Sequence, residues 1–286
     1  MIEVFITDIQ NISQAQAVSA IIQKEIPEFT IHYDFNETAL QFPCGHTILR
    51  VEGIRINCDK IMETVRSQGF KCEILEDKIC SNKEVKKEFW EEAFKGNQEM
   101  WGLTPAKSTV LVNQLFVENK VNSVLIPGIG YGRNAQIFID NGMTVTGIEI
   151  SETAIELGKK HFGNQMTIYH GSVMDMPFDN NTYNGIYCYG LIYLQDKTER
   201  EKLIQDCFNQ LTENGLMVFT AITKDAHTYG KGTFISKDRY EMFGGVQIYF
   251  YDIESITEEF GQFGLFEISE VNENYPFYLI KCRKFV

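Results

Sequence analysis

The sequence predicts an α/β fold, with a seven-stranded, mostly parallel sheet that has helices on both faces and a small α+β unit in front of it. Residues 121–151 read as strand, glycine-rich turn, short helix and second strand, the pattern of a parallel βαβ unit. Apolar strands and amphipathic helices then alternate to residue 286 and end in an antiparallel pair. In residues 1–80 the order is strand, helix, strand, strand, helix, strand, which predicts a separate small unit.

Composition and charge exclude several classes of protein. The chain has 286 residues, of which 44% are hydrophobic, and this length suits a domain of about 200 residues plus a small partner. A net charge of −13 repels polyanions, so neither nucleic acid nor an anionic membrane is an expected partner. The start of the chain carries Glu3, Asp8 and no basic region, and the apolar runs of the sequence are short, so neither a signal peptide nor a transmembrane span is expected. The seven cysteines form no CxxC pair, which indicates reduced thiols and a cytoplasmic protein.

The small unit, residues 1–80, has the βαββαβ order of ferredoxin-like folds. Strands are expected at 3–7, 30–41, 46–51 and 71–75, with Ser13 and Asn57 capping the two helices. This order, a Val-Glu-Gly turn and the segment SQGFKCEIL resemble heavy-metal-associated domains, which bind metal through a CxxC after the first strand. Thr7–Ser13 has no thiol there, so no metal site is expected. Packing, dimerisation and covering of a substrate stay open as roles for this unit.

The stretch between the two units, residues 81–120, is expected to form a linker and a helical lid. Cys80–Lys87 is polar and reads as the linker, and Glu88–Met100 reads as an amphipathic helix. Pro105 suits the first turn of a further helix that Thr104 would cap. Trp90 is expected in the core, whereas core packing and a lid role both remain open for Trp101.

The glycine-rich turn at the start of the third segment, residues 121–286, predicts a nucleoside site. Gly128, Gly130 and Gly132 directly follow a buried strand, and glycine lets a backbone pass close to a ligand. A parallel βαβ unit places its ligand at the carboxyl ends of its strands. Glu149, at the end of the second strand, can hold ribose hydroxyls from there.

The spacing of these glycines separates two kinds of nucleotide site. The chain reads G-x-G-x-G, with Arg133 where the dinucleotide fingerprint has its third glycine, and it has no G-x-x-x-x-G-K-[ST] phosphate loop. The pattern resembles the S-adenosylmethionine (SAM) site of class I methyltransferases. That family usually has an acid two residues before the first glycine, where this chain has Ile126. An apolar-Pro-Gly version, a Trp-rich helix and a WG-x-x-P turn resemble the thiopurine/tellurite-type branch, whose corresponding segment lids cofactor and substrate.

The resemblance implies a Rossmann-like methyltransferase sheet and a set of site residues. Ser172 and Val173 would contact adenine, whereas Asp175 is either an adenine partner or a turn former. Residues 224–245 are expected to be a long loop on the substrate side. The implied cofactor residues are Pro127, Gly128, Gly130, Tyr131, Gly132, Glu149, Ile150, Ser172, Val173 and Tyr189. The implied substrate pocket is Trp101, Tyr193, His227 and Tyr229, with core packing as the alternative for Tyr193.

The expected activity is in-line transfer of a methyl group from SAM to a small-molecule acceptor. Thiolates need little beyond alignment, whereas a hydroxyl or an amine can require a base, for which His170, His227 and Tyr193 are candidates. No residue is assigned as catalytic and no metal ligand set is found. A homodimer is compatible with the sequence. The alternatives are a nucleotide-dependent oxidoreductase, which the glycine spacing disfavours, and a non-catalytic SAM-binding, metabolite-binding or metal-sensing protein.

Overall fold

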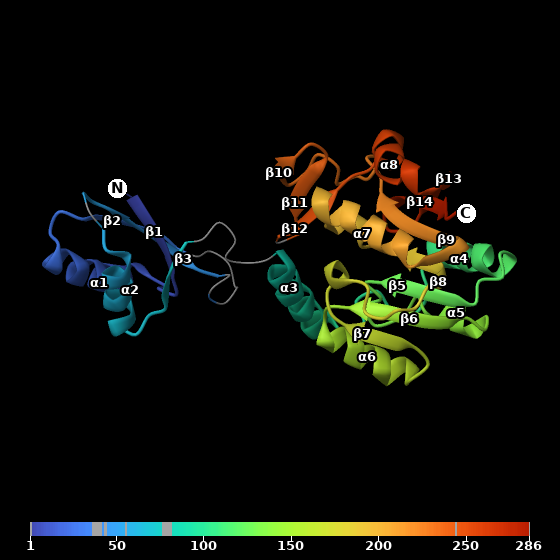
Figure 1. Ribbon diagram of the computed structural model, residues 1–286, viewed down its shortest axis with the longest axis horizontal. Coiled ribbons are helices and arrows are strands. Elements are labelled where there is room, and N and C mark those ends of the chain that lie inside the picture. Colours follow the sequence, from blue (N-terminus) through green and yellow to red (C-terminus); the bar gives the residue numbers. More distant parts are fainter. Residues whose placement is uncertain are drawn as a thin grey trace. The chain divides into compact units, whose positions relative to one another are not determined.

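The computed structural model describes residues 2–35, 42, 45–54, 56–75, 82–243 and 245–285. The chain forms two compact units, Met1–Phe89 and Trp90–Val286 (Figure 1). Helix α3 (Asn82–Asn97) begins inside the polar stretch expected to link the two units, so this stretch is helical from residue 82 onward. The reason is that Lys and Glu, which made this stretch look like a linker, are also good helix formers. Cys80 and Ser81 lie outside the described residues.

The first unit has the element order predicted from the sequence. Its four strands form an antiparallel sheet in the order β2-β3-β1-β4. Phe5, Leu49 and Val51 of the sheet form one buried core with residues of both helices. Asn57 caps α2 as predicted, whereas Asn11, not Ser13, caps α1. The elements are β1 (Ile2–Thr7), α1 (Ile12–Glu25), β2 (Thr30–Asp34), β3 (Thr47–Glu52), α2 (Cys58–Ser67) and β4 (Cys72–Ile74).

The predicted first-unit strand over residues 30–41 is shorter in the structure. Strand β2 ends at Asp34, and residues 36–41 lie outside the described part of the chain. In that part, no group of three or more His, Cys, Asp or Glu side chains is placed to hold a metal ion.

The second unit is built on the predicted seven-stranded sheet. Its order is β13-β14-β9-β8-β5-β6-β7, and β14 runs antiparallel to both of its neighbours while the other pairs are parallel (Figure 1). The carboxyl ends of β5, β6, β8 and β9 therefore lie along one edge. The strands are β5 (Ser123–Pro127), β6 (Thr144–Glu149), β7 (Thr167–His170), β8 (Tyr183–Cys188), β9 (Leu211–Ile222), β13 (Leu265–Asn272) and β14 (Pro276–Arg283).

Both faces of this sheet are buried, which explains its apolar strands. Along β5, Val124 and Ile126 point into the core that includes Phe116 of α4, whereas Leu125 points into the core that includes Leu203 of α7. Within the described residues no helix has the length and apolar character needed to cross a membrane. The helices are α4 (Lys107–Glu118), α5 (Gln136–Asp140), α6 (Glu152–Phe162), α7 (Lys197–Asn209) and α8 (Ile253–Phe260), with 3-10 turns η1 (Val173–Asp175), η2 (Ile192–Leu194) and η3 (Gly261–Phe263).

The segment predicted to be a long loop, residues 224–245, contains strands, so that prediction is wrong. Strands β10 (Thr233–Ser236), β11 (Arg239–Met242) and β12 (Val246–Tyr249) form a three-stranded antiparallel sheet. Their β-branched and aromatic residues favour strands, and the glycines between them made the segment look irregular. A β-carbon at Gly232 would lie 2.2 Å from the Glu241 carbonyl oxygen, so glycine there permits close strand approach. Gly244 lies outside the described residues.

Candidate functional site

The glycine-rich turn needs its glycines. Gly128, Gly130 and Gly132 have φ values of +67°, +58° and +85°, in the region that L-residues with a side chain rarely adopt. A β-carbon would lie 3.0 Å from the Leu191 side chain at Gly128 and 3.0 Å from that of Met166 at Gly132. The turn closes on β6, because the Gly128 N–H donates to the Ile148 carbonyl at 2.9 Å.

Glu149, the last residue of β6, is joined to this turn. Its Oε2 accepts the Gly130 N–H at 2.8 Å, and its Oε1 accepts the N–H groups of Ile150 and Ser151, each at 2.9 Å. Burial raises the pKa of Glu149, and these three hydrogen bonds oppose that shift. A carboxylate has about four acceptor positions, so Oε2 keeps one that a ligand hydroxyl can use.

The loop predicted to contact adenine is tied to Glu149 through its backbone. The Gly171 N–H donates to the Glu149 carbonyl at 2.9 Å. Ser172 caps the 3-10 turn η1, with its hydroxyl oxygen accepting the Met174 N–H at 3.2 Å, and the Asp175 N–H closes the turn on the Ser172 carbonyl. Ser172 and Val173 are both buried beside the end of β7.

Tyr131 connects the glycine-rich turn to the segment before α4. Its hydroxyl donates to the Gly102 carbonyl at 2.7 Å and accepts the Trp101 N–H at 3.1 Å. Its ring stacks on Trp101 with centroids 6.3 Å apart and 15° between the planes. Trp101 is 42% exposed, which excludes ordinary core packing, whereas Trp90 packs on the cluster that contains Phe94 and Tyr131.

A carboxylate on α3 fastens the same segment to α6. Glu91 accepts from the hydroxyls of Ser151 and Thr153 at 2.7 and 2.6 Å, and from the Thr153 N–H at 3.2 Å. Burial alone would raise the pKa of Glu91, but the bonds from Thr153 and Ser151 lower it to about 2. Farther along, Glu99 pairs with His161 of α6. The segment is thus held at both ends on the unit that carries Glu149.

Tyr189, just past β8, lies between an arginine and a carboxylate. Its hydroxyl donates to Glu273 Oε2 at 2.9 Å and accepts from Arg133 at 3.3 Å. Arg133 also donates to the Trp101 carbonyl at 2.9 Å. Sequence reasoning used Arg133 only for the spacing of the glycines and did not identify Glu273. Glu273 lies in the turn of the closing antiparallel pair, level with the carboxyl ends of the parallel strands, and this position is the signal that could have located it.

Helix α4 begins later than predicted, and Glu273 helps to cap it. Ala106, not Thr104, is the N-cap, and it makes no side-chain cap. Two side chains from elsewhere take this role: the Ala106 N–H donates to Asn134 Oδ1 at 3.0 Å, and the Ser108 N–H donates to Glu273 Oε1 at 2.6 Å. Glu273 therefore joins the first turn of α4 to Tyr189, a partnership that a local capping pattern cannot reveal.

The predicted substrate residues lie in different places. Tyr193, in η2, is half-buried with its ring centroid 6.0 Å from that of Phe277, and the exposed His227 stacks on Tyr275 at 5.3 Å. Tyr229 instead donates to Asp238 at 2.6 Å and packs among the rings of the β10–β12 sheet. The structure thus brings the rings of Tyr193 and His227 against Phe277 and Tyr275, and Tyr229 packs on the same buried cluster with its hydroxyl bonded to Asp238. His170, a candidate base, has its Nε2 bonded to the Ile150 carbonyl at 3.1 Å.

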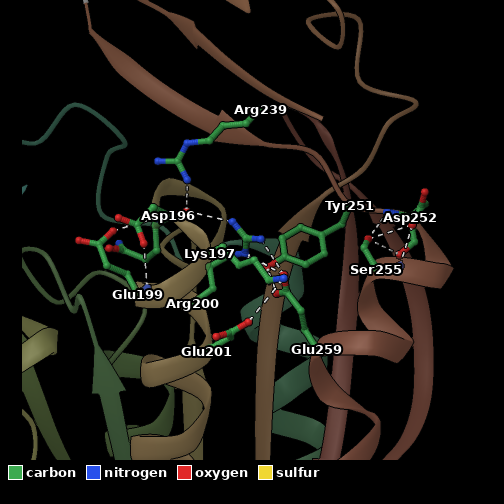
Figure 2. Close-up of polar contacts among 11 residues, drawn as sticks. Asp196, Lys197, Glu199, Arg200, Glu201, Arg239, Tyr251, Asp252, Ser255 and Glu259 are labelled. Carbon is green, nitrogen blue, oxygen red and sulfur yellow. Dashed lines mark hydrogen bonds and ion pairs between the residues drawn. The ribbon is translucent and has the colours of Figure 1, made fainter. Parts of the chain in front are cut away.

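Buried charges fasten the β10–β12 sheet beside Tyr193. The Gln195 carbonyl, directly after η2, accepts from both Arg200 of α7 and Arg239 of β11. Arg200 forms a bidentate pair with Glu259 of α8, with Nη2 donating to Oε1 at 2.7 Å and Nε donating to Oε2 at 3.2 Å, and the Tyr251 hydroxyl donates to the same carboxylate (Figure 2). These contacts tie η2 to α7, α8 and the inserted sheet.

Comparisons with known proteins agree with this architecture. Residues 124–215 match the methyltransferase domain family. An O-methyltransferase of Aspergillus sclerotiorum, resE, is 24% identical over 146 residues, 49% of this chain and 53% of its own. An uncharacterized methyltransferase of Anoxybacillus flavithermus is 31% identical over 126 residues, 44% of this chain and 54% of its own. The chain thus spans about half the length of the curated relatives it matches.

Solved structures define the fold class. The magnesium protoporphyrin IX methyltransferase of Synechocystis with bound SAM superimposes with a TM-score of 0.56 at 12% identity, over 73% of this chain and 100% of its own. The 1,6-didemethyltoxoflavin-N1-methyltransferase of Burkholderia thailandensis gives 0.58 at 13% identity, over 75% and 96%. The fold is that of the class I methyltransferases, and the segment 124–215 carries the methyltransferase domain match within it.

Proposed function

We propose that this protein is a SAM-dependent methyltransferase that acts on a small-molecule acceptor. One observation carries the proposal: the Glu149 carboxylate is held by the Gly130 N–H, next to a turn whose three glycines have positive φ. In this proposal Glu149 binds the ribose hydroxyls and the glycine backbone lies close to the ligand. The domain match over residues 124–215 supports the same reading.

The described residues fit this cofactor on their own geometry. A side chain at Gly128 or Gly132 would crowd Leu191 or Met166, respectively. Because both residues are glycine, no side chain covers the backbone of the turn there. Glu149 has one acceptor position left for a ribose hydroxyl. Ile126 is buried in the core, so it takes no part in holding the methionyl amino group. Pro127, Tyr131, Ile150, Ser172, Val173 and Tyr189 complete the proposed cofactor residues.

In methyl transfer the main role of these residues is to align the two reactants. When bound, SAM supplies a methyl group on a sulfonium sulfur, which is already a good leaving group. A lone pair of the acceptor forms the new bond to the methyl carbon while the carbon–sulfur bond breaks and its electron pair goes to sulfur. The acceptor's proton, where it has one, passes to a base or to water. Holding the two reactants in line can supply about 7–11 kcal/mol of the barrier reduction.

The proposal also covers the methyltransferase branch, the first unit, and the location and partners of the protein. We place the larger unit nearest the thiopurine/tellurite-type branch, on its Ile-Pro-Gly turn and its Trp101 segment. The strand order of the first unit supports a ferredoxin-like domain similar to heavy-metal-associated domains without their CxxC. We further propose a cytoplasmic protein that can form a homodimer and binds neither nucleic acid nor membranes, on its net charge of −13.

A methyl-transfer assay tests the proposal. The full chain is incubated with SAM labelled in its methyl group and a panel of thiols, amines and hydroxyl compounds, and Glu149→Ala serves as the comparison. Transfer by the wild type and its loss in Glu149→Ala are expected. SAM binding without transfer to any panel member would favour the non-catalytic binding protein instead.

A further inference from the structure

Four aromatic rings form a row at the edge of the sheet where the acceptor would lie. The row consists of Tyr193, Phe277, Tyr275 and His227, with successive ring centroids 6.0, 6.5 and 5.3 Å apart. Phe277 pairs with Ile222, the last residue of β9, so the row lies level with the carboxyl ends of the parallel strands. Its members come from η2, from β14, from the turn between β13 and β14 and from the stretch after β9.

The row leads from the interior to the surface. Phe277 is 5% exposed, Tyr193 and Tyr275 are half-buried, and His227 is exposed. At the inner end the Tyr193 hydroxyl lies 3.7 Å from where a β-carbon at Gly190 would stand, and Gly190 directly follows Tyr189. The inner end of the row is therefore next to the proposed transfer site.

The Tyr193 hydroxyl differs from the hydroxyls of two nearby tyrosines in its hydrogen bonding within the described part of the chain. The hydroxyls of Tyr189 and Tyr229 donate to carboxylates, at 2.9 and 2.6 Å. Among the residues that the structure describes, none forms a hydrogen bond with the Tyr193 hydroxyl. A half-buried hydroxyl among aromatic rings normally has a partner, so this one is available to a ligand.

We propose that the methyl acceptor is an uncharged planar aromatic or heteroaromatic molecule that stacks on this row and hydrogen-bonds the Tyr193 hydroxyl through its own hydroxyl or ring nitrogen. Aromatic rings bind other rings in stacked and edge-on arrangements, and the row offers both. The chain's net charge of −13 and the nearby Glu273 carboxylate disfavour an anionic acceptor. The proposal rests on the methyltransferase function proposed above.

Calorimetric titration with two matched probes tests it without knowledge of the natural acceptor. The full chain, saturated with S-adenosylhomocysteine, is titrated with 2-naphthol and with its saturated counterpart, decahydro-2-naphthol. We expect 2-naphthol to bind about tenfold more tightly, as two ring–ring contacts would produce. We expect Tyr193→Phe to weaken 2-naphthol about fivefold through loss of the hydroxyl.

The controls separate local effects from general ones. Phe277→Leu should weaken 2-naphthol binding, whereas Phe266→Leu, which changes an exposed ring on β13, should not. Unchanged affinity for S-adenosylhomocysteine shows that each variant is folded. A protein that binds S-adenosylhomocysteine but shows equal affinities for the two probes, or a Tyr193→Phe variant that binds 2-naphthol like the wild type, would overturn the inference. Failure to bind S-adenosylhomocysteine at all would overturn the proposed function, and this inference with it.

Discussion

Glycines with the same backbone conformation have different surroundings in this protein, and this allows a matched test of the turn. Gly128 and Gly142 have φ values of +67° and +81°, but only at Gly128 would a β-carbon meet another side chain, that of Leu191. Alanine at either position should cost about 1–2 kcal/mol in the free energy of unfolding. Gly128→Ala should also weaken SAM binding about tenfold, because the displaced turn carries the Gly130 N–H.

The comparison with Gly142→Ala identifies the cause of that loss. Chemical denaturation should show destabilisation of both variants, the larger for Gly128→Ala because of the Leu191 contact, while calorimetry should show wild-type SAM affinity for Gly142→Ala. Equal SAM affinity in both variants would mean that the turn does not contact the cofactor.

Glu149 gives the site a predicted pH dependence. Its ionised form is the one that accepts hydrogen bonds from ribose hydroxyls, and burial raises its pKa. The affinity of the protein for SAM should therefore be constant at high pH and should fall as the pH drops through the raised pKa of Glu149. Titrations from about pH 8 to about pH 5 measure the effect. Glu149→Gln should remove this dependence and weaken binding, and an unchanged pH profile in that variant would assign the titration to another group.

At the scale of elements, Glu91 is expected to hold α3 on α6. It accepts three hydrogen bonds from Ser151 and Thr153, whereas its neighbour Glu92 is 74% exposed and pairs with the exposed Lys95. Glu91→Ala should lower the free energy of unfolding by about 1–3 kcal/mol, because it leaves buried donors without acceptors. Glu92→Ala should change it by less than about 0.5 kcal/mol.

The sign of the pH effect at Glu91 follows from its lowered pKa. A carboxyl whose folded-state pKa is about 2 stabilises the protein above its unfolded pKa of about 4, and this contribution is lost as the pH falls toward 2. Chemical denaturation should therefore show the wild type and Glu91→Ala converging as the medium is acidified. A constant difference across this range would contradict the assignment.

The buried pair between α7 and α8 should tolerate removal of both charges better than removal of one. Arg200 and Glu259 are 4% and 10% exposed, and the same carboxylate accepts from Tyr251 (Figure 2). Glu259→Gln should cost about 3–5 kcal/mol in the free energy of unfolding, because it leaves a buried guanidinium uncompensated. The double variant Arg200→Met/Glu259→Met should cost less than this single change.

An exposed pair on the same helix supplies the control for this cycle. Lys197 and Glu201 are 78% and 58% exposed and 3.9 Å apart, so Glu201→Gln should change stability by less than about 0.5 kcal/mol. Chemical denaturation of these variants completes the cycle. A Glu259→Gln variant as stable as Glu201→Gln would show that the pair does not hold α7 to α8.

For the whole molecule, sequence patterns predicted the layers of the fold because those patterns are local. Apolar runs and the spacing of the glycines identified the seven strands and the turn at Gly128, and Asn57 was found as a helix cap. Contacts between distant segments could not be found in this way. The Asn134 and Glu273 partners of α4 lie 28 and 165 residues from the groups they bind. The β10–β12 sheet was missed because glycines concealed its short strands.

At the candidate site, too, local features were predicted from the sequence and contacts between distant segments were not. Glu149 was predicted because its spacing from the glycines is fixed within one βαβ unit, and the structure joins it to Gly130. The partnership of Tyr189 with Glu273 spans 84 residues and follows from the antiparallel position of β14. Tyr229 was predicted from composition alone, and the structure shows its hydroxyl bonded within the inserted sheet.

The most direct test of the central claim is a calorimetric titration of the full chain with SAM, S-adenosylhomocysteine and NADH. We expect micromolar binding of the two adenosyl ligands and none of NADH. Glu149 and the G-x-G-x-G turn suit a nucleoside, and the turn has Arg133 where a dinucleotide site has its third glycine. A folded, ligand-free protein that binds NADH, or that binds neither adenosyl ligand, would contradict it.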